Sequence, residues 1–287
     1  MAAAGHPVNP VRLGGGFRFG EGPRWFEGML WFSDVLGEAV HTVDLTGAMT
    51  TLPLPGRAPS GLGFRPDGTL LIVSTRDRQV LRYDGDDVTP VADLSGLVPA
   101  DLGDMVIDER GRAYVGSQAR EGGVIVRVDL DDTATVVADR LDLPNGMAIT
   151  PDGHTLIVAE STGRRLTAFT VDDDGGLSDR RVFADGLEGP PDGLTVDAEG
   201  GLWVAMTVAQ RFDRIVDAGG GRHEVTDRID VAGRTAIACT LGGSEGRTLF
   251  LLSCIDARPE RLAGSKDSRV DALLVDVPAP GALHHHH

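Results

Sequence analysis

The chain has 287 residues, of which 41% are hydrophobic, so it can build a sizeable core within one or two domains. Acidic residues outnumber basic ones by 43 to 27, and the formal net charge of −16 disfavours binding to nucleic acid or to anionic membrane surfaces. The 39 glycines and 16 prolines argue against a helical bundle and favour a fold rich in turns.

The two ends of the chain are expected to lie outside the folded domain. Residues 1–10 have neither the basic segment nor the apolar run of a signal peptide, and no apolar run approaches the ~20 residues of a membrane span. We therefore predict a cytoplasmic protein with a flexible N-terminus at residues 1–10. Residues 281–287 are interpreted as a linker and a partial histidine tag.

From residue 23 onward, one pattern recurs six times: an apolar strand, a polar turn that contains glycine, and a second apolar strand. Consecutive turn glycines are 40 to 47 residues apart, a period typical of a repeat fold. The six copies are PRWFEGMLWFSD (23–34), FRPDGTLLIVST (64–75), IDERGRAYVGS (107–117), ITPDGHTLIVAES (149–161), VDAEGGLWVAM (196–206) and LGGSEGRTLFLLS (241–253).

Each of the first five copies is followed by a second predicted hairpin, beginning with residues 39–52 and ending with residues 213–229. Four strands per repeat are typical of a propeller blade. The sixth repeat has one clear strand after its hairpin, at residues 271–278, and lacks a fourth. The N-terminal segment 11–22 can supply that strand and close the ring. We predict an all-β, six-bladed propeller over residues 11–280, in preference to a β-sandwich with repeated hairpins.

The segments that enter the six repeats are expected to meet at one mouth of the central channel. Counting back seven or eight residues from each turn glycine reaches a polar residue in five of the six copies. These candidates for a common site are Glu21, Ser60, Asp104, Asn145 and Asp192. Carboxylate and amide oxygens suit Ca²⁺, Mg²⁺ or Mn²⁺, and Zn²⁺ less well. The alternative is that these residues only cap turns locally.

At these residues the sequence resembles the gluconolactonase/regucalcin/luciferin-regenerating-enzyme family. The motifs that carry the resemblance, which extends over about residues 11–280, are GEGPRW (20–25), LWFSDV (30–35), LPNGMAITPDGHTLIVAES (143–161), PDGLTVDAEGGLWVA (191–205) and CTLGGSEGRTLFLLS (239–253). The resemblance implies a six-bladed propeller with one divalent cation in the channel, most often calcium, with Glu21, Asn145 and Asp192 as ligands. It also implies lactone hydrolysis, in which the cation polarises the carbonyl and Asp192 activates water.

One part of the predicted site departs from this family. Its third-blade motif commonly reads Asn-Asp, and here the pair is Gly103–Asp104. Sugar lactonases of the family often have a basic residue where Asp101 stands. The wall of the substrate site is therefore predicted to differ, which favours a substrate less polar than a sugar lactone. Gln118 and Arg211, which follow predicted inner strands, complete the substrate-binding candidates together with Ser60, Asp101, Gly103 and Asp104.

Two other functions fit the same scaffold. The metal site could serve a different reaction, such as aryl or phosphate ester hydrolysis or a condensation, or the propeller could bind calcium without catalysis. In each case the partner is a small molecule or an ion.

Three further expectations concern the oligomeric state, the source and the cysteines. A monomer is expected because a closed propeller exposes few strand edges. The single Lys266 beside 26 arginines is typical of a GC-rich bacterial source. Cys239 and Cys254 are predicted to be buried thiols, although their separation alone does not decide whether they pair.

Overall fold

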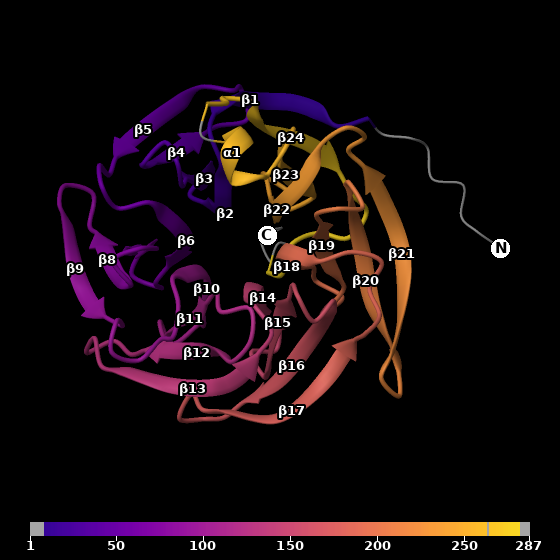
Figure 1. The fold of residues 1–287 in the computed structure, drawn as a ribbon. Helices are drawn as coiled ribbons and strands as arrows, with labels where there is room; N and C mark the ends of the chain where they lie inside the picture. Colours follow the sequence, from indigo (N-terminus) through magenta and orange to yellow (C-terminus); the bar gives the residue numbers. More distant parts are fainter. Residues whose placement is uncertain (1–8, 263, 282–287) are drawn as a thin grey trace, which may run out of the picture.

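The predicted repeats form six antiparallel sheets of four strands each around a central axis in the computed structural model, which describes residues 9–262 and 264–281 (Figure 1). Residues 1–8 and 282–287, and with them most of the predicted flexible N-terminus and tag, lie outside the described residues. The six-bladed propeller is confirmed, and the sandwich alternative is wrong. The domain boundaries at residues 11 and 280 stay a prediction.

The first three blades each use four consecutive strands. Blade one holds β2 (Gly20–Phe26), β3 (Met29–Asp34), β4 (Ala39–Val43) and β5 (Met49–Pro53). Blade two holds β6 (Pro59–Phe64), β7 (Leu70–Ser74), β8 (Gln79–Tyr83) and β9 (Val88–Asp93). Blade three holds β10 (Leu102–Ile107), β11 (Ala113–Ser117), β12 (Gly123–Val128) and β13 (Ala134–Leu141).

Blades four and five continue this order. Blade four holds β14 (Pro144–Ile149), β15 (Thr155–Glu160), β16 (Arg165–Val171) and β17 (Leu177–Ala184). Blade five holds β18 (Pro191–Val196), β19 (Leu202–Met206), β20 (Arg211–Gly219) and β21 (Arg222–Asp230). Within each blade the first strand lies nearest the axis and the fourth forms the outer edge (Figure 1).

Blade six joins the two ends of the chain. It consists of β22 (Thr235–Gly242), β23 (Thr248–Cys254), β24 (Ser268–Leu274) and the N-terminal β1 (Val11–Phe17), which pairs antiparallel with β24. The predicted closure of the ring is confirmed. The third strand lies earlier than predicted, and the chain after Leu274 leaves the sheet as the proline-containing segment 275–281, in which Pro278 and Pro280 have no amide hydrogen to donate.

Apolar side chains fill the space between neighbouring blades. Trp25 of blade one stacks on Phe250 of blade six with ring centroids 5.2 Å apart, and Trp31 meets Phe64 of blade two edge-on. Both cysteines are free and buried, as the sequence predicts. The helix α1 (Pro259–Leu262) is one turn long, and none of the described helices is long and apolar enough to cross a membrane.

Candidate functional site

Each of the first five inner strands has a β-bulge at the residues predicted to form the site. In β6, β10, β14 and β18 the register slip encloses the site residue, whereas in β2 it begins directly after Glu21, which itself pairs with Ser33. A bulge leaves one residue without a cross-strand partner and redirects its side chain. Asp104, Asn145 and Asp192 therefore leave the alternating pattern of an ordinary strand, and their side chains become available to the channel.

The inner strands approach one another closely because glycines stand at the bulges. A Cβ atom on Gly146 would lie 2.5 Å from the carbonyl oxygen of Asp192 on the next blade, and one on Gly61 would lie 2.5 Å from the amide nitrogen of Met105. No other residue type fits such a contact without a shift of the backbone. Asn145 and Asp192 are thereby brought together from neighbouring blades.

Glu21 and Asp192 are buried acids whose charges meet in the channel. Burial and the negative charges of Asp192 and Asp104 raise the pKa of Glu21 well above its usual value. Burial, followed by the charge of Asp104, raises the pKa of Asp192 to about 8, against smaller opposing effects of hydrogen bonds from the Asn145 amide and the Gly193 N–H. The predicted convergence of these three acids and Asn145, which come from four blades, is thus present.

The Asn145 carboxamide is oriented by Ser161, which directly follows the second strand of its blade. Its Nδ2 donates to Ser161 Oγ at 3.3 Å, and Ser161 Oγ donates to the carbonyl of Pro191 at 2.6 Å. Because the amide nitrogen is engaged in this way, the amide oxygen remains as an acceptor. In blade one the hydroxyl of Ser33 on β3 likewise donates to a carbonyl of the next blade, that of Ser60, at 2.6 Å.

Arg24 is a site residue that the sequence analysis missed. Its guanidinium donates to Asp104 Oδ1 at 3.2 Å and to the carbonyls of Pro23 and Met105, so that Asp104 is held by a cation. Burial raises the pKa of Asp104, and the neighbouring Arg24 opposes that rise. A signal was present in the sequence: four residues before the turn glycine, four other repeats have an apolar residue, and only the first has a charge.

The remaining predicted residues are divided between the mouth and the blade surface. Ser60 is buried at the bulge of β6, and Gly103 is buried beside Asp104 on β10. Asp101 is half exposed, and its carboxylate lies 3.6 Å from Arg78. Gln118 and Arg211 lie at the ends of strands outside the innermost one. Gln118 follows the second strand β11, and Arg211 begins the third strand β20, where it pairs with Asp213 and Glu188.

The donor set of Glu21, Asn145 and Asp192 fits a hard divalent cation. Asp192 Oδ1 is buried and has no hydrogen-bond partner among the described residues, which is costly for a carboxylate unless a ligand fills the gap. The repulsion between the two carboxylates would be relieved by positive charge. Over residues 9–262 and 264–281, no group of three or more His, Cys, Asp or Glu side chains is arranged to hold a metal. The protein ligands for a cation would be the carboxylates of Glu21 and Asp192 and the amide oxygen of Asn145.

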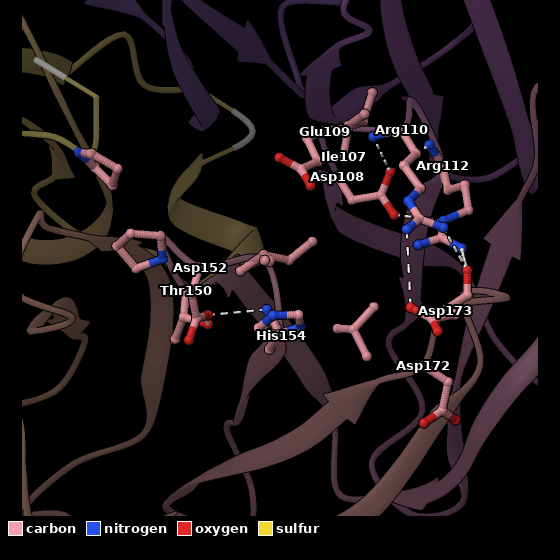
Figure 2. A pocket seen from close by; sticks show the side chains of 15 residues that line it. Ile107, Asp108, Glu109, Arg110, Arg112, Thr150, Asp152, His154, Asp172 and Asp173 are labelled. Carbon is pink, nitrogen blue, oxygen red and sulfur yellow. Dashed lines mark hydrogen bonds and ion pairs between the residues drawn. The ribbon is translucent and has the colours of Figure 1, made fainter. Parts of the chain in front are cut away.

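Two cavities lie toward the opposite end of the inner strands. One cavity, of about 300 Å³, occupies the channel and is lined by residues of all six inner strands. Most of these residues are apolar, and Arg24 is the charged one. The other, of about 250 Å³, lies between the turns of blades three and four (Figure 2). There Asp108 pairs with Arg112 at 2.6 Å, and Asp152 accepts the His154 N–H at 3.0 Å. These polar groups are at the far ends of β10 and β14 from Asp104 and Asn145.

Comparisons with known proteins agree with this architecture. Residues 19–255 match the family model described as the SMP-30/Gluconolactonase/LRE-like region. A 6-deoxy-6-sulfogluconolactonase from Pseudomonas putida is 28% identical over 88% of this chain and 84% of its own. A pentonolactonase from Haloferax volcanii is 31% identical over 60% of each chain. The crystal structure of a calcium-binding protein, regucalcin from Agrobacterium tumefaciens, superposes with a TM-score of 0.79 at 24% identity over 95% of both chains.

Proposed function

The chain belongs to the SMP-30/gluconolactonase/LRE-like family, and from this premise we propose that it is a hydrolase that opens lactones where Glu21, Asn145 and Asp192 meet. The observation that carries the proposal is the buried Asp192 Oδ1 without a partner, beside a second carboxylate and an oriented amide. Two relatives are named as lactonases, which supports the same class of substrate.

Glu21, Asn145 and Asp192 are the residues proposed to hold one divalent cation. Calcium is the first choice, since the ligands are all oxygen and the regucalcin of similar fold is described as calcium-binding, whereas Mg²⁺, Mn²⁺ and Zn²⁺ are the alternatives. When bound, the cation would supply Lewis-acid polarisation of the ester carbonyl.

Asp192 is proposed to act as the base. Its carboxylate accepts a proton from a water molecule as the water oxygen adds to the lactone carbonyl carbon. The ring C–O bond then breaks, and the proton passes to the departing ring oxygen, so that lactone and water yield a hydroxy acid.

The substrate is proposed to lie against residues of blades two, three and five around this centre. Asp104 is held by hydrogen bonds from the Arg24 guanidinium at 3.2 Å and from the Met105 N–H at 2.8 Å. The substrate-binding candidates are Ser60, Asp101, Gly103, Asp104, Gln118 and Arg211.

The test is hydrolysis of a panel of lactones by chelator-treated protein before and after addition of Ca²⁺, Mg²⁺, Mn²⁺ or Zn²⁺, beside the variant Asp192→Asn. We expect turnover only with added metal, and a loss of about 10²–10⁴-fold in kcat in the variant. Full activity after chelation would overturn the metal assignment. Turnover of aryl or phosphate esters far above that of lactones would replace the lactonase assignment, and metal binding without any turnover would favour a calcium-binding propeller.

A further inference from the structure

Gln118 occupies the space that a side chain at position 103 would otherwise fill. A Cβ atom on Gly103 would lie 2.7 to 2.9 Å from three atoms of the Gln118 side chain, namely Nε2, Cγ and Cδ. Contacts that short do not occur between real side chains, so Gly103 is the residue that leaves room for this carboxamide. The Gln118 amide therefore lies directly over the bulge of β10, next to Asp104.

The segment that carries Gln118 is anchored on both sides. The Gln118 N–H donates to the carbonyl of Asp101 at 2.7 Å within blade three. The next residue, Ala119, accepts a hydrogen bond from the Leu143 N–H at 2.8 Å, two residues before Asn145 in blade four. A side chain on a doubly anchored segment is preorganised, which lowers the entropy lost on binding a ligand.

The Gln118 carboxamide is free to bind a ligand. It is partly buried, and neither its oxygen nor its nitrogen makes a hydrogen bond to another of the described residues. The two acids of β10 and its entry are already paired, Asp101 with Arg78 and Asp104 with Arg24. This edge of the site therefore presents a neutral donor and acceptor rather than a net positive charge, which suits a hydroxyl group better than an anionic substituent.

We propose that Gln118 is a specificity-determining residue whose carboxamide hydrogen-bonds a hydroxyl group of an uncharged, hydroxylated lactone. The inference rests on the proposed function and narrows its substrate class. Gly103 acts indirectly, because it allows Gln118 to lie there.

The test compares γ-butyrolactone with its α-hydroxy derivative as substrates of the wild type, Gln118→Ala, Gly103→Ala and the double variant. We expect each single variant to lower kcat/KM for the hydroxylated lactone about 10-fold, mainly through KM, and to lower kcat/KM for the unsubstituted lactone by a clearly smaller factor. The double variant should lose no more than either single one, because both remove the same contact. Glu121→Ala, an exposed change in the same segment, is the control and should match the wild type for both lactones.

Calorimetric binding of both lactones, with calcium present, separates this inference from the proposed function. If the wild type turns over no lactone but binds the hydroxylated one more tightly than Gln118→Ala does, the proposed hydrolysis is wrong and the role of Gln118 stands. Equal affinity of the wild type and Gln118→Ala for the hydroxylated lactone, or an equal loss for both lactones, would overturn the role of Gln118.

Discussion

Asp192 combines burial, a neighbouring negative charge and an oxygen without a hydrogen bond. The pKa of Asp192 in the folded chain lies above that of an unfolded aspartate. The ionised carboxylate therefore destabilises the metal-free fold as the pH rises above the pKa of the unfolded aspartate. Such an arrangement is expected of a site built for a ligand rather than for stability.

Asp192→Asn is expected to stabilise the chelator-treated protein by about 1–3 kcal/mol, because it removes a buried charge with an unsatisfied oxygen. Calcium at 100 times its Kd should stabilise the wild type by about 2.7 kcal/mol and leave the variant unchanged. Thermal unfolding with and without calcium measures both effects. Asp86→Asn, on an exposed turn, is the control and should retain the calcium response of the wild type. A variant that is less stable than the wild type without metal would contradict the argument.

At the scale of the strand, the bulges and their glycines set the geometry of the site. Gly146→Ala would place a methyl group 2.5 Å from the Asp192 carbonyl oxygen, so that β14 and β18 must separate. We expect a loss of about 1–3 kcal/mol or more in the free energy of unfolding, together with weaker metal binding. Gly116→Ala on β11 is the matched control, because its nearest contacts would be an ordinary 3.5 Å.

Denaturant unfolding and metal titration of the two alanine variants measure these effects. If Gly146→Ala bound metal as tightly as Gly116→Ala did, the close approach of the inner strands would be irrelevant to the site.

Glu160, at the end of β15, connects β16, β17 and the segment between β13 and β14 through hydrogen bonds and ion pairs. It is fully buried, pairs with Arg165 Nη2 at 2.7 Å and with Arg180, and accepts the Asp142 N–H at 2.7 Å. Although burial acts in the other direction, the combined hydrogen bonds from Arg165, Thr167 and Asp142 lower its pKa. The stabilisation by ionised Glu160 is therefore complete above the unfolded pKa of about 4.3 and is lost as the pH falls through the lower folded value.

Glu160→Gln should destabilise the protein at pH 7 by about 3–5 kcal/mol, because two arginines lose their buried partner. The difference in melting temperature between the variant and the wild type should then shrink from pH 5 toward pH 3. Melting curves across this range provide the measurement. A difference that stays constant down to pH 3 would show that the charge of Glu160 is not what stabilises the blade.

The strand periodicity predicted the position of each site residue along its strand but not the contacts of its side chain. Glu21, Asn145 and Asp192 could be found because each stands seven or eight residues before the turn glycine of its repeat. The pairing of Arg24 with Asp104 joins residues 80 positions apart and depends on how two bulges redirect their strands. The contact of Gln118 with Gly103 likewise depends on a register slip that the repeat pattern does not encode.

At the scale of the whole molecule, the site depends on closure of the ring. Glu21 belongs to blade one and Asp192 to blade five, and blade six between them is completed by the N-terminal β1. The channel end can therefore keep its geometry only while β1 stays paired with β24 (Figure 1). Stability and ligand binding should respond together when this pairing is weakened.

Phe17 is the residue of β1 through which this coupling can be tested. Its ring is 3% exposed and lies 4.8 Å from that of Phe32, so Phe17→Ala should cost about 3–5 kcal/mol in the free energy of unfolding. Val11→Ala changes a residue of the same strand that is 71% exposed and should stay within about 0.5 kcal/mol of the wild type. If closure is cooperative, denaturant unfolding of Phe17→Ala will show one transition at lower denaturant, with metal binding lost in the same transition. A separate early transition that leaves metal binding intact would mean that β1 detaches while the other five blades preserve the site, because Glu21 and Asp192 would then keep their positions without a closed ring.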